Sequence, residues 1–401
     1  VRDEWMQAAA TLLGGAEQPA LEHALRALLL SGHVVEERTL EGSVYFTRTM
    51  HAAELRLALR LRELATSTVR PLGDVAALLD RYENARAVRL ASAQREAVLR
   101  AATAPVLVIT GGPGVGKTTV VRALLALFDE ARVPVRLAAP TGRAAKRMQE
   151  ASGHEAQTIH RLLEFDPKRG MFHRVASRPI EAGAVIVDEA SMIDLQLADS
   201  LAQAVAPGTR LVLVGDVDQL PSVGPGAVLR DVIASEVAPT VRLTHVFRQG
   251  AASLTVENAH LINSGRPPRT SRDPAADFFV IERREPEAAR DTVLELVRER
   301  IPRRFGLDPL RDVQVLTPMH RGEAGAAALN DALQSALNPR GPSLVRGGRT
   351  FRVGDKVMQL RNDYDKDVWN GDVGFVSGID DDELVVRFDD GKERNYGAGE
   401  P

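Results

Sequence analysis

One segment, from Gly111 to Thr118 with the sequence GGPGVGKT, restricts the fold of this chain more than any other. It follows the apolar run Val106–Ile109 and leads into a second apolar run that starts at Val120. The spacing matches the phosphate-binding pattern G-x-x-x-x-G-K-S/T, in which a buried strand, a glycine loop and a helix follow one another. The loop N–H groups and the positive end of the helix dipole favour a bound anion. The chain is therefore predicted to contain an α/β nucleotide-binding domain built on a parallel sheet.

Each residue type in this loop has a predicted role. Gly114 and Gly116 let the backbone curl around a phosphate, where a Cβ atom would collide with the ligand. We expect Lys117 to reach the β- and γ-phosphates and the hydroxyl of Thr118 to bind Mg²⁺. The other predicted nucleotide contacts in the loop are Gly112, Val115 and Thr119. The alternative, a glycine-rich turn before an ordinary helix, is disfavoured by the flanking strand and helix patterns.

Two later apolar runs also end in polar residues, and strands of a doubly wound sheet bind ligands at that end. The run 184–187 precedes Asp188 and Glu189. We expect Asp188 to hold Mg²⁺ through water and Glu189 to deprotonate the attacking water. The run 211–214 precedes Gln219, an uncharged group placed to sense a γ-phosphate. Acidic pairs at strand ends are common, but here a phosphate loop lies upstream in the same alternating pattern.

Two further residues are candidates for the nucleotide site. Gln94 carries an amide that can donate to and accept from an adenine edge. It lies just ahead of the phosphate loop, in a helix that Ser92 is predicted to cap; in isolation it would be an ordinary surface glutamine. Arg248 follows a predicted strand at 241–243 and is placed to supply positive charge to a transition state.

Polar residues near other strand ends are candidates for a nucleic-acid track. Most combine a hydroxyl or proline with a cation where a strand passes into a helix, and one lies in a rigid proline- and glycine-rich loop. We expect them to line one groove and to contact the backbone and stacked bases. The alternative is a set of solvated first helical turns. The candidates are Pro140, Thr141, Arg143, Thr158, His160, Val223, Thr317 and Arg321.

Composition limits these interpretations. The 401 residues are enough for two or three domains. The chain has no cysteine, which excludes disulfides and thiolate metal sites and suits a cytoplasmic protein. No apolar run approaches the about 18 residues of a membrane span. The formal net charge of −3 means that nucleic-acid binding cannot be inferred from net charge and needs a local surface.

Hydrophobic patterns predict the remaining elements. Residues 1–88 show two helices and a hairpin in a winged-helix-like order, or alternatively a small packing domain. Residues 164–182 interrupt the α/β alternation and predict a projecting hairpin around Lys168–Gly170, the alternative being a disordered loop. A second α/β unit is expected over 251–340, with strands at 278–281 and 313–317 and helices at 285–300 and 324–337. Short strands over 341–401 predict a small β-barrel.

Taken together, the motifs from Gln94 to Arg321 resemble those of superfamily-1 DNA helicases of the RecD type. The resemblance implies RecA-like motor domains at 89–250 and 251–340, with a pin at 164–182 that splits the duplex and an SH3-like insertion at 341–401. It also implies ATP and Mg²⁺ as cofactors, single-stranded DNA and single-strand/double-strand junctions as partners, a monomeric state and 5′→3′ movement. Arg248 would be the arginine that meets the γ-phosphate.

One departure from the family pattern concerns the end of the chain. The family continues into motifs V and VI, and neither occurs before Pro401. We therefore expect this chain to be part of a longer helicase. The competing hypotheses are a P-loop ATPase that remodels proteins and a DNA-binding module without unwinding activity. ATP hydrolysis that depends on DNA would exclude the first, and strand separation would exclude the second.

Overall fold

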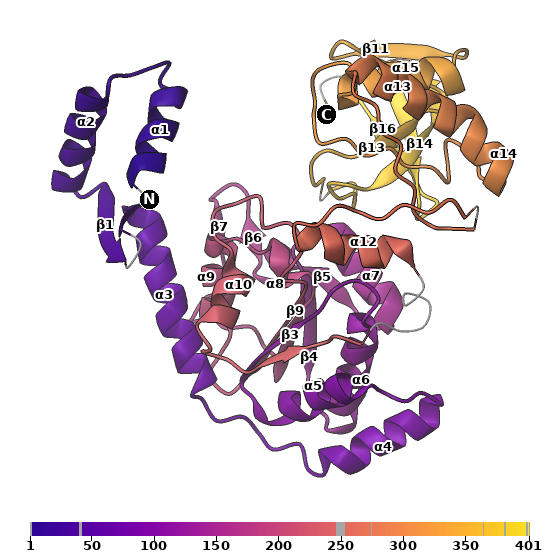
Figure 1. The fold of residues 1–401 in the computed structure, drawn as a ribbon. Helices are drawn as coiled ribbons and strands as arrows, with labels where there is room; N and C mark the ends of the chain where they lie inside the picture. The colour runs from indigo at the N-terminus through magenta and orange to yellow at the C-terminus, as the bar shows by residue number, and fades with distance from the viewer. Residues whose placement is uncertain are drawn as a thin grey trace. The chain divides into compact units, whose positions relative to one another are not determined.

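The computed structural model describes residues 2–39, 42–245, 253–273, 275–363, 365–380, 382–397 and 400, and Figure 1 shows their elements. The chain forms two compact units. The first unit comprises residues 1–140 and 144–252, and the second comprises 141–143 and 253–401. Among the described residues, no helix combines the length and the apolar character of a membrane-spanning segment.

The first unit is built around a parallel six-stranded sheet in the order β10-β3-β9-β8-β4-β5. Every residue of the central strands β3, β8 and β9 is buried, as expected when helices cover both faces of a parallel sheet. The prediction of a parallel α/β domain is confirmed. The strands are β3 (Val106–Thr110), β4 (Val135–Ala139), β5 (Ala156–Thr158), β8 (Ala184–Val187), β9 (Arg210–Gly215) and β10 (Thr240–Arg242).

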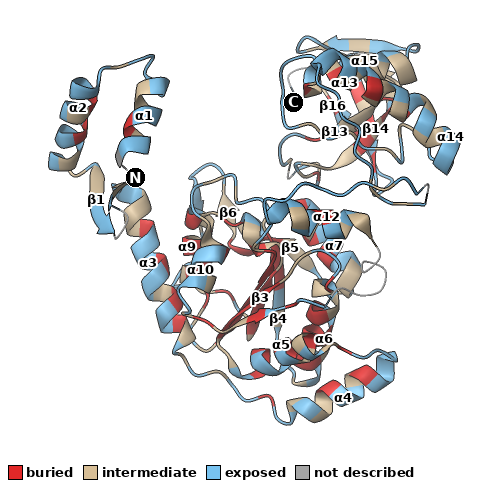
Figure 2. Cartoon of the chain, in the orientation of Figure 1, coloured by how far each residue is buried: buried red, intermediate tan, exposed pale blue. Residues whose placement is uncertain are grey.

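Side-chain alternation along the strands divides the interior into two cores. In β3, Val106 and Val108 face one core, while Leu107 and Ile109 face the other, as the two-residue period of a strand requires. Figure 2 shows this buried interior along the central strands. The helices of this region are α5 (Ser92–Thr103), α6 (Lys117–Glu130), α7 (Gly142–Ser152), α8 (Ile159–Leu162), η1 (Ala190–Met192), α9 (Leu195–Ala204) and α10 (Val228–Ala234).

The N-terminal elements have the predicted order of two helices and a hairpin, and a long helix follows them. They are α1 (Arg2–Leu12), α2 (Gln18–Leu30), β1 (Val34–Thr39), β2 (Gly42–Thr47) and α3 (Arg48–Ala65). The C-terminal half of α3 joins the core beside the sheet through Leu57, Leu61 and Leu64. A further helix, α4 (Val75–Arg86), packs on α5 and α6.

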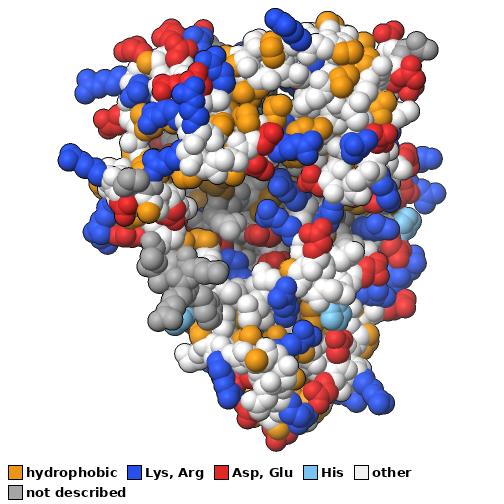
Figure 3. Space-filling model, turned by 90° about the vertical axis from the view of Figure 1, so that its right-hand side faces the viewer, with side chains coloured by type: hydrophobic (Ala, Val, Ile, Leu, Met, Phe, Trp, Pro, Cys, Tyr) orange, Lys and Arg blue, Asp and Glu red, His pale blue; other side chains and the backbone are white. Residues whose placement is uncertain are grey.

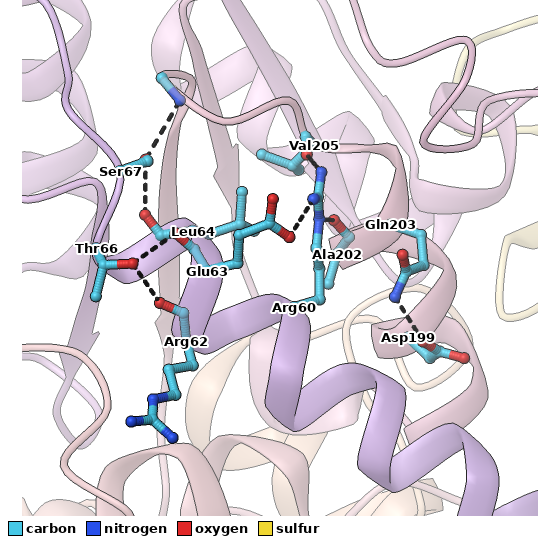
Figure 4. Close-up of polar contacts among 11 residues, drawn as sticks. Arg60, Arg62, Glu63, Leu64, Thr66, Ser67, Asp199, Ala202, Gln203 and Val205 are labelled. Atoms are coloured by element: carbon cyan, nitrogen blue, oxygen red, sulfur yellow. Dashed lines mark hydrogen bonds and ion pairs between the residues drawn. The ribbon is translucent and has the colours of Figure 1, made fainter.

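Polar contacts fix α3 against α9, as Figure 4 shows. Arg60 donates from Nη2 to the carbonyl oxygen of Val205 (2.6 Å) and from Nε to that of Ala202 (3.2 Å). These carbonyls lie at the C-terminal end of α9, where helix C=O groups lack internal partners and a cation is favoured. One turn earlier, Arg56 pairs with the nearly buried Asp199 at 2.6 Å. The helix is therefore shared by the N-terminal elements and the sheet domain.

The predicted hairpin within 164–182 is present. Strands β6 (Phe165–Asp166) and β7 (Met171–Phe172) pair antiparallel. Their turn is closed by the Gly170 N–H, which donates to the carbonyl oxygen of Asp166 (2.8 Å). Arg174 secures the base of the hairpin through Glu164 (2.7 Å) and Glu181 (3.1 Å).

The second unit contains the expected helices but lacks two expected strands. The segments 278–281 and 313–317, predicted as strands, form no hydrogen-bonded ladder with any described residue. A strand needs a neighbour to accept its N–H groups, and here Phe279 and Leu316 are 44% and 88% exposed. The helices are α12 (Leu254–Asn263), α13 (Pro286–Glu295), the π-helical η2 (Leu296–Arg300), α14 (Ile301–Phe305) and α15 (Ala326–Leu337).

The predicted β-rich end is confirmed as a four-stranded antiparallel sheet, β13-β14-β15-β16, accompanied by the pair β11-β12. Its own core includes Val376, Val386 and Phe388. Asp355 ties this sheet to α15 by accepting from Asn338 Nδ2 (2.7 Å). The strands are β11 (Ser343–Arg346), β12 (Arg349–Arg352), β13 (Lys356–Met358), β14 (Val373–Asp380), β15 (Glu383–Phe388) and β16 (Glu393–Tyr396).

Candidate nucleotide and nucleic-acid sites

The predicted nucleotide residues gather at one edge of the parallel sheet. The loop 111–116 follows β3, Asp216 follows β9, and Asp188 follows β8. Strands β3, β9 and β8 are consecutive neighbours in the sheet, and the carboxyl ends of parallel strands meet at the same edge. This is the edge where doubly wound sheets bind ligands.

The glycine loop is shaped as its sequence predicted. Gly114 and Gly116 have φ angles of +74° and +81°, which a residue with a Cβ atom adopts only with strain. Gly116 is the N-cap of α6, so the free N–H groups of that helix face the loop. The ammonium of Lys117 donates to the carbonyl oxygens of Gly111 (2.6 Å) and Gly112 (3.1 Å).

The remaining loop residues differ in what they offer a ligand. The side chain of Val115 is buried in the core, so only its backbone is available to a nucleotide. Thr118 is exposed and Thr119 is half-buried at the start of α6. An exposed hydroxyl at this position remains free to approach a cation from the solvent side.

The acidic pair is half-buried, and its second member has a strained backbone. The N–H of Glu189 donates to Asp188 Oδ1 (2.8 Å). Burial raises the pKa of Asp188, and the charge of Lys117 opposes that rise. Burial also raises the pKa of Glu189, followed by the nearby Asp188 charge, while Lys117 again opposes it. Glu189 has φ +53°, a left-handed conformation that costs about 1–3 kcal/mol and occurs mostly at functional sites.

One carboxylate oxygen of Glu189 is also unsatisfied in its hydrogen bonding within the described part of the chain. Its Oε2 is buried, and no described residue offers it a hydrogen bond. Leaving such an acceptor unsatisfied costs about 1–3 kcal/mol, more when it is charged. The arrangement therefore favours a polar occupant, such as a water molecule, against this carboxylate.

The end of β9 packs tightly on the acidic segment, a relation that the sequence analysis missed. A Cβ atom added to Gly215 would lie only 3.1 Å from the backbone nitrogen of Ser191. In the sequence, this close packing is indicated only by the glycine that follows the apolar run 211–214. Beyond it, Asp216 is buried, whereas the predicted Gln219 and Val223 are exposed.

Gln94 lies beside the phosphate loop, but its amide already has protein partners. Its Nε2 donates to the carbonyl oxygens of Val115 (3.1 Å) and Gly116 (3.4 Å), and its Oε1 accepts from the Ala91 N–H (3.0 Å). The predicted capping by Ser92 is wrong, because α5 begins at Ser92 and Ala91 is the N-cap. Gln94 is only 2% exposed. Its hydrogen bonds join the start of α5 to the phosphate loop.

The DNA candidates between residues 140 and 160 lie at the ends of the neighbouring strands β4 and β5. Thr158 is the N-cap of α8 and its hydroxyl accepts from the Arg161 N–H (3.2 Å). The ring of His160 packs against Phe165 and Phe172 of the hairpin, with centroid distances of 5.4 and 5.6 Å. Burial lowers the pKa of His160. The candidates Pro140, Thr141 and Arg143 occupy the passage from β4 to α7.

In the second unit, the Thr317 hydroxyl donates to the carbonyl oxygen of Ala324 (2.9 Å), and Arg321 is exposed. Figure 3 shows basic and acidic side chains interspersed on the face that it displays, in keeping with the net charge of −3. The predicted catalytic Arg248 lies outside the described residues.

Comparisons with known proteins match both parts of the chain. A family model described as an AAA domain matches residues 94–225, and one described as the SH3 domain of ATP-dependent RecD-like DNA helicases matches residues 329–388. The ATP-dependent RecD2 DNA helicase of Deinococcus radiodurans is 36% identical over 352 residues, which cover 88% of this chain and 47% of that protein. The RecBCD enzyme subunit RecD of Mycolicibacterium smegmatis is 33% identical over 341 residues, covering 74% and 59%.

This chain therefore spans about half the length of these relatives. Among solved structures, the Bacteroides Pif1 helicase bound to single-stranded DNA matches with a TM-score of 0.44 and 19% identity. That match covers 77% of this chain and 74% of that one.

Proposed function

Because this chain belongs to the RecD-type superfamily-1 helicases, we propose that it is the ATP-driven motor region of a DNA helicase. The observation that carries the proposal is the meeting of the glycine loop, Asp188 and Glu189 at one edge of the sheet, with a buried oxygen left for a polar occupant. The proposed substrates are single-stranded DNA and its junctions with duplex, and the proposed direction is 5′→3′. The proposed motor acts as a monomer in the cytoplasm.

The residues present fit ATP with Mg²⁺. The positive φ angles of Gly114 and Gly116 leave room for phosphate oxygens. Thr118 and Asp188 offer the hard oxygen ligands that Mg²⁺ prefers. No group of three or more histidine or acidic side chains in the described part of the chain could hold a metal ion by itself, so phosphate and water would complete the coordination. When bound, Mg-ATP supplies the phosphoryl group and the neutralising charge of the reaction.

The protein's own groups then have separate roles in hydrolysis. Lys117 leaves its carbonyl partners for the β- and γ-phosphates, and Glu189 accepts a proton from the attacking water. Gln219 senses the γ-phosphate, and Arg248 is proposed to stabilise transition-state charge. Gln94 is the proposed adenine contact, since its Oε1 retains a second lone pair.

DNA contacts are proposed at the strand ends and turns of each unit. Thr141 and Arg143 would serve where β4 passes into α7, His160 would serve in α8, and Thr317 and Arg321 would serve in the turn before α15. Contacts of this kind go to the phosphate backbone and to stacked bases, which makes binding salt-sensitive and nearly independent of sequence.

The test is the ATPase rate of the chain with and without single-stranded DNA, followed by a strand-separation assay on a duplex with a 5′ single-stranded tail. We expect DNA to stimulate hydrolysis. Hydrolysis that responds to unfolded protein and not to DNA would favour a remodelling ATPase. DNA-stimulated hydrolysis without strand separation would favour a DNA-binding motor that does not unwind.

Shortening the hairpin is expected to separate translocation from unwinding. Phe165 and Phe172 face each other across the strands, so Gly-Gly in place of residues 166–171 closes the hairpin with a two-residue turn. ATPase stimulated by single-stranded DNA should remain largely intact, because the removed segment holds no phosphate-binding residue. Unwinding by the parent protein should be lost.

The matched control for this change is the double substitution of Lys168 and Arg169 by alanine, which removes the charge of the tip but keeps its length. Retained unwinding in this control would assign the effect to hairpin shape. Equal loss of ATPase and unwinding in the shortened hairpin would contradict the pin hypothesis and indicate a purely structural segment.

A further inference from the structure

One buried carboxylate lies outside the set of predicted site residues. Glu83, in the last turn of α4, is only 2% exposed. It accepts from the Leu90 N–H (2.9 Å), from Arg95 Nη1 (2.6 Å) and from Arg89 Nη1 (3.3 Å). A carboxylate is rarely buried unless its charge is fully paired. Glu83 therefore anchors the segment that leads from α4 into α5.

Glu83 is linked to Gln94 through the backbone N–H groups of two consecutive residues, Leu90 and Ala91. The N–H of Leu90 donates to Glu83, and the next N–H, that of Ala91, donates to Gln94 Oε1 (3.0 Å). Arg95, the neighbour of Gln94, holds the same carboxylate. Glu83 thus fixes both the turn before α5 and the helical residue that follows Gln94.

The fixed turn determines which way the Gln94 amide points. Its oxygen must face the Ala91 N–H, and its nitrogen must face the carbonyl oxygens of Val115 and Gly116. A rotation of the amide by 180° would place like groups against each other at both ends. The orientation of the amide is therefore set by the protein before any base arrives.

A Gln94 amide with a fixed orientation can distinguish adenine from guanine. Adenine presents a donor at N6 beside an acceptor at N7, whereas guanine presents acceptors at both O6 and N7. Because the Gln94 nitrogen already donates to two loop carbonyl oxygens, its fixed oxygen is the group left for a base. That oxygen can accept from adenine N6 and is repelled by guanine O6. An amide that is free to rotate can turn its nitrogen toward O6 and tolerate guanine.

We propose that Glu83 is a positioning residue for base selection, which sets the preference for adenine by holding the Ala91 peptide and thereby the Gln94 amide. The proposal rests on the proposed function, because it takes Gln94 as the adenine contact. It also places the beginning of the nucleotide site in α4, ahead of the glutamine.

The test measures dissociation constants of Mg-ATP and Mg-GTP for the 401-residue chain and its variants. Glu83→Ala should lower the preference for ATP over GTP on the order of tenfold, the scale of one hydrogen bond to a base, by weakening ATP while GTP binds at least as well as before. Glu83→Gln keeps an acceptor for the Leu90 N–H and should show a smaller loss in the same ratio. If the Glu83→Ala variant does not fold, the nucleotide affinities of Glu83→Gln alone still test the proposal.

The matched control is Asp80→Asn. Asp80 pairs with the same Arg95 at 2.9 Å, but its side chain is 59% exposed, so the preference for ATP should not change. Adding Glu83→Gln to Gln94→Ala should cause no further loss of preference, because the two residues act in series. A purely structural role would weaken both nucleotides equally and would overturn the proposal.

Two results separate this inference from the proposed function. A wild-type chain that prefers ATP, together with Glu83 variants of unchanged preference, would overturn the positioning role alone. A wild-type chain without any preference would overturn both that role and the assignment of Gln94 as the adenine contact.

Discussion

Replacing Glu189 with glutamine is expected to lower DNA-stimulated ATP turnover by about 10² to 10⁴, while the affinity for Mg-ATP stays near that of the wild type. The glutamine amide has the shape of the carboxylate but cannot accept the proton of the attacking water. Binding should persist because the phosphate contacts come from the glycine loop and Lys117. The measurement is the steady-state ATPase rate of the parent protein on single-stranded DNA, together with nucleotide binding at equilibrium.

Two variants show whether the effect is specific. Glu130→Gln makes the same isosteric change at the end of α6, where Glu130 pairs with Arg81 at 2.5 Å in an exposed position, and should leave turnover unchanged. Lys117→Ala should weaken binding as well as turnover, because it removes a cation from the phosphates. Wild-type turnover in Glu189→Gln would show that another group is the base.

Arg210→Ala is expected to lower the free energy of unfolding by about 3–5 kcal/mol, the range for losing a buried charged group with its hydrogen bonds. Arg210 begins β9 and is only 1% exposed. It donates to the carbonyl oxygens of Ala101 (3.1 Å), Ala102 (2.9 Å) and Arg70, and burial lowers its pKa. Alanine would leave these carbonyls at the end of α5 without their donor and would open a cavity beside Phe128, over whose ring the guanidinium lies at 5.9 Å.

Urea denaturation followed by circular dichroism measures this loss. Arg136→Ala is the matched control, since Arg136 is an exposed arginine on the neighbouring region of the same sheet, and it should change stability by no more than about 0.5 kcal/mol. Equal effects of the two substitutions would mean that the buried guanidinium contributes no more than a surface one.

The elements that could be predicted from the sequence are those whose structure depends on a local pattern. The strands that became β3, β8 and β9 are apolar runs bounded by glycine or acidic residues, and full burial on both faces produces such runs. The loop 111–118 was equally recognisable, because its backbone geometry demands glycine at fixed positions. The hairpin around Lys168 was found because it breaks the α/β period.

The errors and omissions concern relations between distant parts of the chain. The segments 278–281 and 313–317 have strand-like composition, but a strand also requires a hydrogen-bonded neighbour, which composition does not reveal. The contact of Gln94 with the phosphate loop was not predicted, because its partner Gly116 lies 22 residues away. Glu83 was not among the predicted site residues, since its partners Arg89, Leu90 and Arg95 are brought to it only by the packing of α4 beside α5.

Helix α3 has a mechanical consequence for the motor. Its 18 residues rise about 27 Å, and one half is clamped to α9 while the other carries the β1-β2 hairpin. A stiff rod clamped at Arg60 turns about that point, so a tilt of about 10° would move the far end of the helix, about 18 Å away, by about 3 Å. If the proposed nucleotide cycle shifts the acidic segment, the N-terminal elements should therefore swing, since α9 begins six residues after Glu189. Labels on α2 and α9 would report that stroke as a change in distance.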